Sequence, residues 1–237
     1  MNSTGLRPIA ILLDAISEVS SKWPVLLRAL ALPASGTAIA TILVLKYGYS
    51  ANVQWALIIP MLAFYALFAT SCHRIILLGA ESLPNEFGIY WSHREVRFTG
   101  WLVLVAIVYA VVWAPFQLLF MATPQLLHDL HISWFLPVFV ATYFEGRFSM
   151  VLPATAVDQK MDLRGSWYLT RRSGLAIAVA LFIPALGMDF LHILVANVLE
   201  EHSLLLATLV SEILIFPIIA VAVGVLSVTY RAVTFQE

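Results

Sequence analysis

Acid and base side chains occur inside long apolar segments of this sequence, where a charge is costly unless a partner or a function accounts for it. They are Glu145, Arg147, Asp189, His192 and Glu212. A charged side chain at the centre of a bilayer costs about 2.5–3.5 kcal/mol on insertion scales, so such groups normally turn inward and find partners. Groups of this kind can relay protons or bind a polar solute. They can equally form a structural ion-pair network between helices, and the sequence leaves both interpretations open.

The spacing of these residues predicts how they pair. Glu145 and Arg147 are two residues apart and point to different faces of one helix, so Arg147 needs a partner on another helix. Counted along the helix, Arg147 lies about 15 Å from the cytoplasmic loop. Asp189 and Glu212 lie at a similar depth on the next two helices, so we expect Arg147 to pair with one of them. His192 comes three residues after Asp189 and shares its helical face.

A second polar group lies near the ends of apolar segments and is mostly basic. His73 and Arg74 close one segment, and Glu81, seven residues after Arg74, shares its helical face. Such residues can bind a lipid headgroup or take part in catalysis, and interfacial anchoring explains them as well. In the later segment 158–173, Asp162 is the predicted N-cap of a short interfacial helix. Its basic residues include Arg164, Arg171 and Arg172. These residues can bind anionic lipid headgroups, and the ordinary positive-inside signal explains them as well.

Sequence motifs that would identify an enzyme or a cofactor site are missing. HExxH, GxxxxGK[ST], GxGxxG and GxSxG do not occur. Cys72 is the single cysteine, which leaves no disulfide within the chain and no cysteine-based metal site. His128 and His131 are three residues apart but have no third ligand nearby. We therefore expect no metal, no cofactor and no enzymatic activity, with an intramembrane enzyme as the least favoured alternative.

The elements that must position these side chains are long apolar helices. The chain is 61% hydrophobic and 11% charged, whereas a soluble domain is about 25% charged. Only a helix satisfies its own backbone groups inside hydrocarbon, so residues 24–237 are predicted to form an all-α, polytopic bundle of six transmembrane helices. Segments long enough to cross a core of about 30 Å cover residues 24–45, 53–78, 99–123, 132–157, 174–199 and 203–229.

Residues 1–23 precede the first span and carry an amphipathic pattern. Apolar residues recur at helical spacing from Leu6 to Trp23, and Asp14, Glu18 and Lys22 lie mostly off that face. This pattern is typical of a helix that lies in the membrane interface. A helix packed on the protein's own cytoplasmic loops fits the pattern as well. The acids also interrupt the apolar run before it resembles the core of a cleavable signal peptide.

Basic residues are distributed unequally between the two ends of the predicted bundle. The N-terminal segment, the two long loops and the tail carry most of them, whereas Lys46 is the one basic residue in the three short loops. By the positive-inside rule, both termini lie in the cytoplasm. The formal net charge of −1 argues against a nucleic-acid partner.

Three stretches resemble a group of uncharacterised bacterial proteins with six spans. They are HRIILLGAE at residues 73–81, RFSMVLPATAVD at 147–158 and SWYLTRRSG at 166–174. That group is similar to the membrane domain fused to some glycerophosphodiester phosphodiesterases. The resemblance covers roughly residues 70–175, and the flanking segments match in hydropathy alone. It implies a bacterial inner-membrane location and transfers no catalytic residue.

Two hypotheses for the function follow. The first is a non-enzymatic membrane module that supports a protein complex or organises lipid. Its partners are the bilayer, anionic lipid headgroups, and a membrane protein or a second copy of the chain. The second is a small-solute or proton-coupled transporter built around Arg147, Asp189 and Glu212. A water-accessible cavity that reaches Arg147 favours transport, whereas a dry pair between Arg147 and a carboxylate favours the module.

Overall fold

The computed structural model describes residues 6–47, 51–83, 91–122, 132–199 and 203–234. These residues form helices and contain no strand. The elements in chain order are α1 (Pro8–Ser21), α2 (Trp23–Tyr47), α3 (Ala51–Leu78), η1 (Ala80–Ser82), α4 (His93–Ala122), α6 (Ile132–Phe148), α7 (Val151–Ala156), α8 (Leu163–Leu169), α9 (Gly174–Leu199) and α10 (Leu204–Thr234).

Six helices within the described ranges are long and apolar enough to cross a membrane, so the chain is a multi-pass membrane protein. This confirms the predicted all-α bundle with six spans. The spans are Trp23–Tyr47, Ala56–Leu78, His93–Leu119, Phe135–Ala156, Gly174–Leu199 and Leu204–Thr234. Each of α2, α3, α4, α6, α9 and α10 contains an internal proline, which is tolerated because neighbouring helices and side chains compensate for the lost hydrogen bond.

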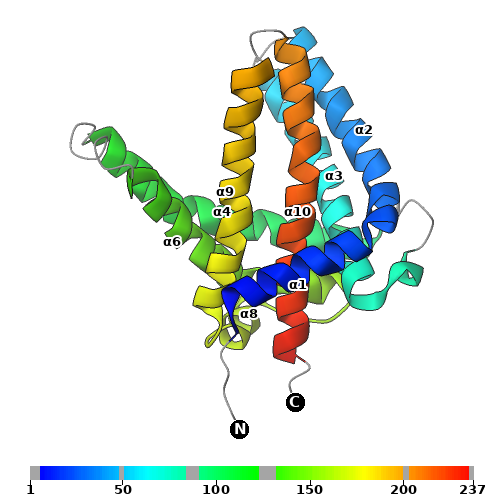
Figure 1. Ribbon diagram of the computed structural model, residues 1–237, viewed down its shortest axis with the longest axis vertical. Coiled ribbons are helices and arrows are strands. Elements are labelled where there is room, and N and C mark those ends of the chain that lie inside the picture. The colour runs from blue at the N-terminus through cyan, green and yellow to red at the C-terminus, as the bar shows by residue number, and fades with distance from the viewer. Residues whose placement is uncertain (1–5, 48–50, 84–90, 123–131, 200–202, 235–237) are drawn as a thin grey trace.

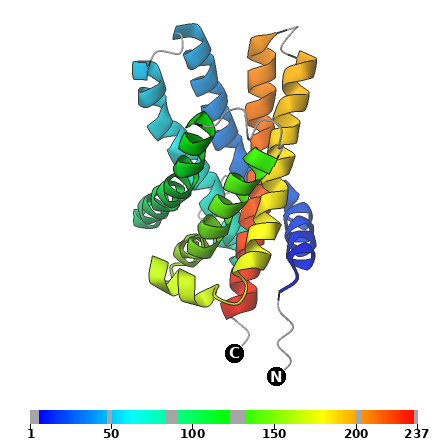
Figure 2. The same cartoon turned by 90° about the vertical axis from the view of Figure 1, so that its left-hand side faces the viewer.

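The spans are not all parallel. Helices α2, α3, α9 and α10 run along the length of the molecule, whereas α4 and α6 lean away from α9 toward the end opposite the termini (Figure 1). Figure 2 shows α1 on the outside of the bundle, with both termini at the same end. Helix α4 packs on α6 and α7, while α10 packs on α3 and α9. Helix α6 also packs on α9, and α3 packs on α4, so the site described below lies among all of these helices.

Helix α1 packs on α10 and α9 at the end of the bundle that holds both termini. Its buried residues Ile11, Ala15 and Val19 recur every four positions, and Val19 and Ala15 approach Gly224 of α10. The other side of α1 is also apolar, since Ile9 is 65% exposed. Helix α1 therefore packs on membrane-spanning helices on one side and exposes apolar side chains on the other.

Glu18 ties α1 to the end of α10. Its carboxylate pairs with Lys22 Nζ at 2.6 Å and with Arg231 Nη2 at 2.7 Å. Lys22 Nζ also donates to the carbonyl of Ile76 at 3.2 Å. Burial by itself would raise the pKa of the Glu18 carboxyl, but the hydrogen bonds and positive charges of Lys22 and Arg231 together outweigh it and lower the pKa below 4.5.

We expect the Glu18→Gln variant to lose a pH-dependent part of its stability. Because the pKa of Glu18 is lower in the folded protein, its contribution is present above pH 4.5 and is lost as the pH falls through the folded-state value. The variant should have a lower Tm than the parent at pH 7, and the difference should shrink below pH 4.5. Thermal unfolding in detergent measures this. Asp14→Asn, at an exposed position of the same helix, is the control; an equal pH dependence in both variants would contradict the prediction.

The fourth span is broken near its C-terminal end. Helix α6 stops at Phe148, a turn follows at Ser149 and Met150, and the buried helix α7 continues the chain. The amide of Ser149 still bonds to the carbonyl of Glu145 at 2.8 Å. The predicted cap is confirmed, because the Asp162 side chain accepts a hydrogen bond from the Gly165 amide at 2.7 Å and α8 follows it. Helix α8 folds back against α6, which changes the surroundings of Arg147.

Candidate functional site

A cavity of about 540 Å³ lies between α3, α4, α6, α7, α9 and α10. Most of its lining is apolar, as expected for helices that pack in hydrocarbon. The polar side chains that reach it come from three helices and the α6–α7 turn; they are Tyr65, His73, Tyr109, Thr142, Glu145 and Ser149. A mostly apolar cavity of this size with a few convergent polar groups is the usual form of a site for a small ligand.

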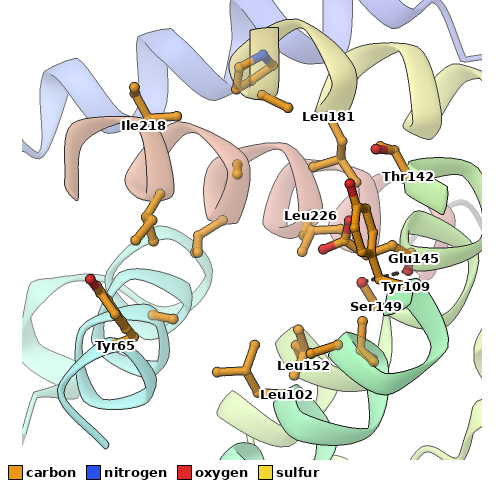
Figure 3. Close-up of a pocket in the computed structure, with 18 of the residues that line it drawn as sticks. Tyr65, Leu102, Tyr109, Thr142, Glu145, Ser149, Leu152, Leu181, Ile218 and Leu226 are labelled. Atoms are coloured by element: carbon orange, nitrogen blue, oxygen red, sulfur yellow. Dashed lines mark hydrogen bonds between the residues drawn. The ribbon is translucent and has the colours of Figure 1, made fainter. Parts of the chain in front are cut away.

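Glu145 is the acidic residue of this cavity. Its backbone carbonyl accepts hydrogen bonds from the amide and hydroxyl of Ser149, at 2.8 and 2.6 Å, where α6 ends. Its carboxylate forms no hydrogen bond or ion pair with any residue that the structure describes. Figure 3 shows Glu145 beside Tyr109, with Ser149 below them. The carboxylate is therefore an available acceptor inside a largely apolar space.

Gly146 explains how α6 directs Glu145 toward the cavity. A Cβ at Gly146 would lie 2.9 Å from Cγ2 of Ile177, so the missing side chain lets α6 approach α9 closely. Because neighbouring residues on a helix point in different directions, that close contact leaves Glu145 on the wall of the cavity. The contact between α6 and α9 thus fixes the orientation of the acid.

His73 reaches the same cavity from α3 and is fully buried. Its Nδ1 lies 2.7 Å from Ser227 Oγ of α10, and its ring packs 5.8 Å from the ring of Phe98. Its Nε2 is buried and has no hydrogen-bond partner among the described residues. Unpaired buried polar atoms are rare in proteins, so this nitrogen is a second group without a partner, although the atom itself is not exposed to the cavity.

The other predicted intramembrane acids lie outside the cavity lining. Glu212 accepts a hydrogen bond from the Tyr65 hydroxyl at 3.1 Å, and the Tyr65 ring packs 5.7 Å from the ring of Phe216. Asp189 is half-buried on α9, and His192, one turn later, is exposed. The structure therefore joins Glu212 to the cavity through Tyr65 and keeps Asp189 and His192 apart from it.

Arg147 has different partners from those expected. Its guanidinium donates to Thr170 Oγ1 at 2.9 Å, to the Tyr143 hydroxyl at 3.0 Å and to the Trp167 carbonyl at 2.6 Å. It also lies 3.7 Å from the centre of the Trp167 ring, in a cation–π contact. The residue is 5% exposed, and it forms no ion pair with a carboxylate of the described part of the chain.

The expected pairing of Arg147 with Asp189 or Glu212 assumed a straight fourth helix. Because α6 ends one residue after Arg147 and α8 folds back beside it, the guanidinium meets loop groups before it can reach another span. Uncharged acceptors and an aromatic face can satisfy an arginine without a carboxylate. The five predicted residues therefore do not form one network: Glu145 faces the cavity, Arg147 holds α8, and Glu212 binds Tyr65.

His73 and Arg74 are predicted as one group, but their side chains contact different parts of the structure. Arg74 donates to the carbonyls of Ala156 and Ser82, each at 2.9 Å, whereas His73 faces the cavity. Of the five residues predicted to lie near headgroups, Arg164, Arg171 and Arg172 are exposed, and Arg164 lies 5.7 Å from the centre of the Tyr168 ring.

Asp158 is a centre of charge that the sequence did not single out. Arg94 lies 3.2 Å from its carboxylate, Arg74 lies 3.5 Å away and Arg97 lies 4.0 Å away. Its φ of +60° is a left-handed conformation that aspartate and asparagine tolerate better than most residues. One carboxylate thus joins the end of α3 and the start of α4 to the end of the fourth span.

We expect Asp158→Asn to destabilise the protein in a salt-dependent way. The amide keeps the tolerance for positive φ but leaves three guanidinium groups facing one another without their shared acid. Because the Asp158 side chain is 58% exposed, the cost should be small, about 1 kcal/mol at low salt. Thermal unfolding in 20 mM and 500 mM salt measures it, and the difference should fade at high salt as the charges are screened. A salt-independent loss would contradict this assignment.

No group of three or more histidine, cysteine, aspartate or glutamate side chains within the described ranges is placed to hold a metal ion. Comparison with protein-family models, curated proteins and solved structures finds no match to the chain. The geometry of the cavity is thus the basis for the function proposed below.

Proposed function

We propose that this protein is a non-enzymatic membrane module that binds a lipid-like molecule in its central cavity. One observation carries the proposal: a cavity of about 540 Å³ in the membrane-spanning bundle is mostly apolar but contains the unpartnered carboxylate of Glu145. An alkyl chain suits the apolar walls, and a polar head suits the acid. An intramembrane ionisable residue without a protein partner is best explained by a functional partner.

The transporter built around Arg147, Asp189 and Glu212 has less support from the geometry. None of these three side chains lines the cavity, and Arg147 is held by Trp167 and Thr170. Within the described residues, Arg147 also lacks the dry ion pair with a carboxylate that would have favoured a purely structural module. Lipid binding at Glu145 requires only the cavity that the structure contains. It does not require a pathway for a solute past Arg147.

The same proposal places the protein in a bacterial inner membrane with both termini in the cytoplasm, like the six-span proteins that its sequence resembles. The basic residues of α8 and of the end of α10 lie at the end of the bundle where the termini are (Figure 1). Positive charge accumulates on the cytoplasmic side of membrane proteins. A C-terminal green fluorescent protein fusion should fluoresce and an alkaline phosphatase fusion should be inactive. The reverse pattern would contradict this orientation.

Lipid quantification on the purified protein tests the binding proposal. The full chain is purified in mild detergent, and its bound lipid is extracted and measured by mass spectrometry. A variant with Ala106→Trp and Ala222→Trp fills the cavity from two sides, since both alanines line it. Ala114→Trp, at an exposed position of α4 outside the lining, is the matched control.

We expect the parent and the control to retain a similar amount of lipid and the cavity-filled variant to retain several-fold less. Elution as a single species and an unchanged Tm show that each variant is folded. Equal lipid in all three proteins would mean that the bound lipid lies on the outer surface, and the proposal would be wrong.

A further inference from the structure

We infer that the ligand of this cavity is a lipophilic amine, whose ammonium group donates hydrogen bonds to the carboxylate of Glu145. The inference rests on the proposed function and adds the chemical class of the head group. It follows from counting which groups in the cavity can donate a hydrogen bond and which can accept one.

The hydrogen bonds of Ser227 determine which nitrogen of His73 carries the proton. The Ser227 hydroxyl donates to the carbonyl of Val223 at 2.8 Å, so its single hydrogen is already used. With that hydrogen on the Val223 carbonyl, the contact of 2.7 Å between Ser227 Oγ and His73 Nδ1 is a bond in which Nδ1–H donates. In a neutral imidazole the other nitrogen is an acceptor. The unpartnered Nε2 of His73 therefore offers a lone pair.

Glu145 is the acid that lines the cavity, and its two oxygens offer lone pairs to a donor. No lysine or arginine side chain lines the cavity, and the nearest in sequence, Arg147, is held by Trp167 and Thr170. The Tyr65 hydroxyl is used by Glu212, and the Ser149 hydroxyl is used by the Glu145 carbonyl. The hydroxyls of Tyr109 and Thr142 each keep a hydrogen to donate, but no basic side chain balances Glu145. The lining thus carries an acid without a basic partner, a surplus that a ligand with a positive charge and several donors can satisfy.

An ammonium group fits this surplus better than other head groups. It carries donors and a positive charge, and hydrogen bonds between charged groups are about twice as strong as those between neutral ones. Tyr109 lies beside Glu145 on the cavity wall and offers an aromatic face to a cation (Figure 3). A carboxylate or phosphate head would bring a like charge to Glu145 and would be disfavoured.

Three photoreactive probes with the same alkyl chain test the inference directly. Each carries a diazirine in the chain, and they end in a primary amine, a hydroxyl and a carboxylate. The full chain is placed in phosphatidylcholine nanodiscs and labelled over a range of probe concentrations, and labelled residues are identified by mass spectrometry. We expect the amine to label cavity residues at a half-saturating concentration about tenfold below that of the alcohol, with the carboxylate weakest.

Two variants separate the role of Glu145 from a general effect of charge. Glu145→Gln should raise the half-saturating concentration of the amine to that of the alcohol and leave the alcohol nearly unchanged. Asp189→Asn is the matched control, because it also removes an intramembrane carboxylate but lies outside the cavity lining; it should leave both probes unchanged. The comparison of the three probes on the parent protein needs no variant, so it remains valid if Glu145→Gln fails to fold.

The outcomes distinguish this inference from the function on which it rests. If the three probes label the cavity equally, the preference for an amine is wrong while lipid binding stands. If the amine binds best and Glu145→Gln leaves its binding unchanged, the assigned recognition group is wrong. If no probe labels the cavity, both the inference and the proposed function are wrong.

Discussion

Replacing Arg147 with alanine is expected to lower the free energy of unfolding by about 3–5 kcal/mol, because hydrogen bonds from a charged donor, a desolvated cation–π contact and buried volume are lost together. The guanidinium joins α6 to the Trp167 carbonyl, to Thr170 and to the Trp167 ring. Without it, the Trp167 carbonyl keeps only the longer contact of 3.4 Å with the Thr170 hydroxyl. The loop 157–173 should then detach from α6 before the rest of the bundle unfolds.

Thermal unfolding in detergent measures this effect, and we expect the Tm to fall by roughly 10 °C. Arg147→Lys should recover only part of the loss, since an ammonium cannot reproduce the planar fork or the stacking on Trp167. Arg171→Ala, which removes an exposed arginine from the same loop, is the control and should change the Tm little. A Tm for Arg147→Ala within a degree of the control would show that these contacts do not hold the loop.

Gly174→Ala is the second substitution with a large expected effect. A Cβ at this first residue of α9 would overlap Cδ of Arg147, and Nε of Arg147 would lie 3.2 Å away. Because Arg147 is held on several sides, it cannot move aside freely, and we expect overpacking to cost about 1–3 kcal/mol. The same thermal unfolding measures it.

The two substitutions should not be additive. In the Arg147→Ala background the colliding atoms are gone, so adding Gly174→Ala should cost much less than it does in the parent. Gly187→Ala on the same helix, where a Cβ meets nothing within 4 Å, is the control for the helix itself. Full additivity would mean that Gly174 is required for another reason.

Hydropathy and spacing were sufficient to predict the six spans, because the requirement for helix in hydrocarbon overrides local propensity. The cap at Asp162 followed from a local rule and is confirmed. The sequence also placed Glu145 and Arg147 on different faces of a helix, and the structure puts one at the cavity and the other against α8. Each of these features depends on residues that are close together in the sequence, so local rules are sufficient to predict it.

The partners of Arg147 were not predictable in the same way. The break after Phe148 carries no strong sequence signal, since Ser149 and Met150 are ordinary helix residues and Pro153 lies in the first turn of α7, where proline is tolerated. Once the helix breaks, depth counted along the sequence is no longer depth in the membrane. The cavity was missed as well, because single residues such as Tyr109 and Ser149 are common in membrane helices and gain meaning only when the fold brings them together.

A cryo-EM density map of the protein purified in native nanodiscs tests the central claim most directly. The account predicts elongated density between the leaning helices α4 and α6 and the upright α3 and α10, with its head end within hydrogen-bond distance of Glu145. An empty or collapsed space in which the Glu145 carboxylate binds another side chain of the protein would contradict it.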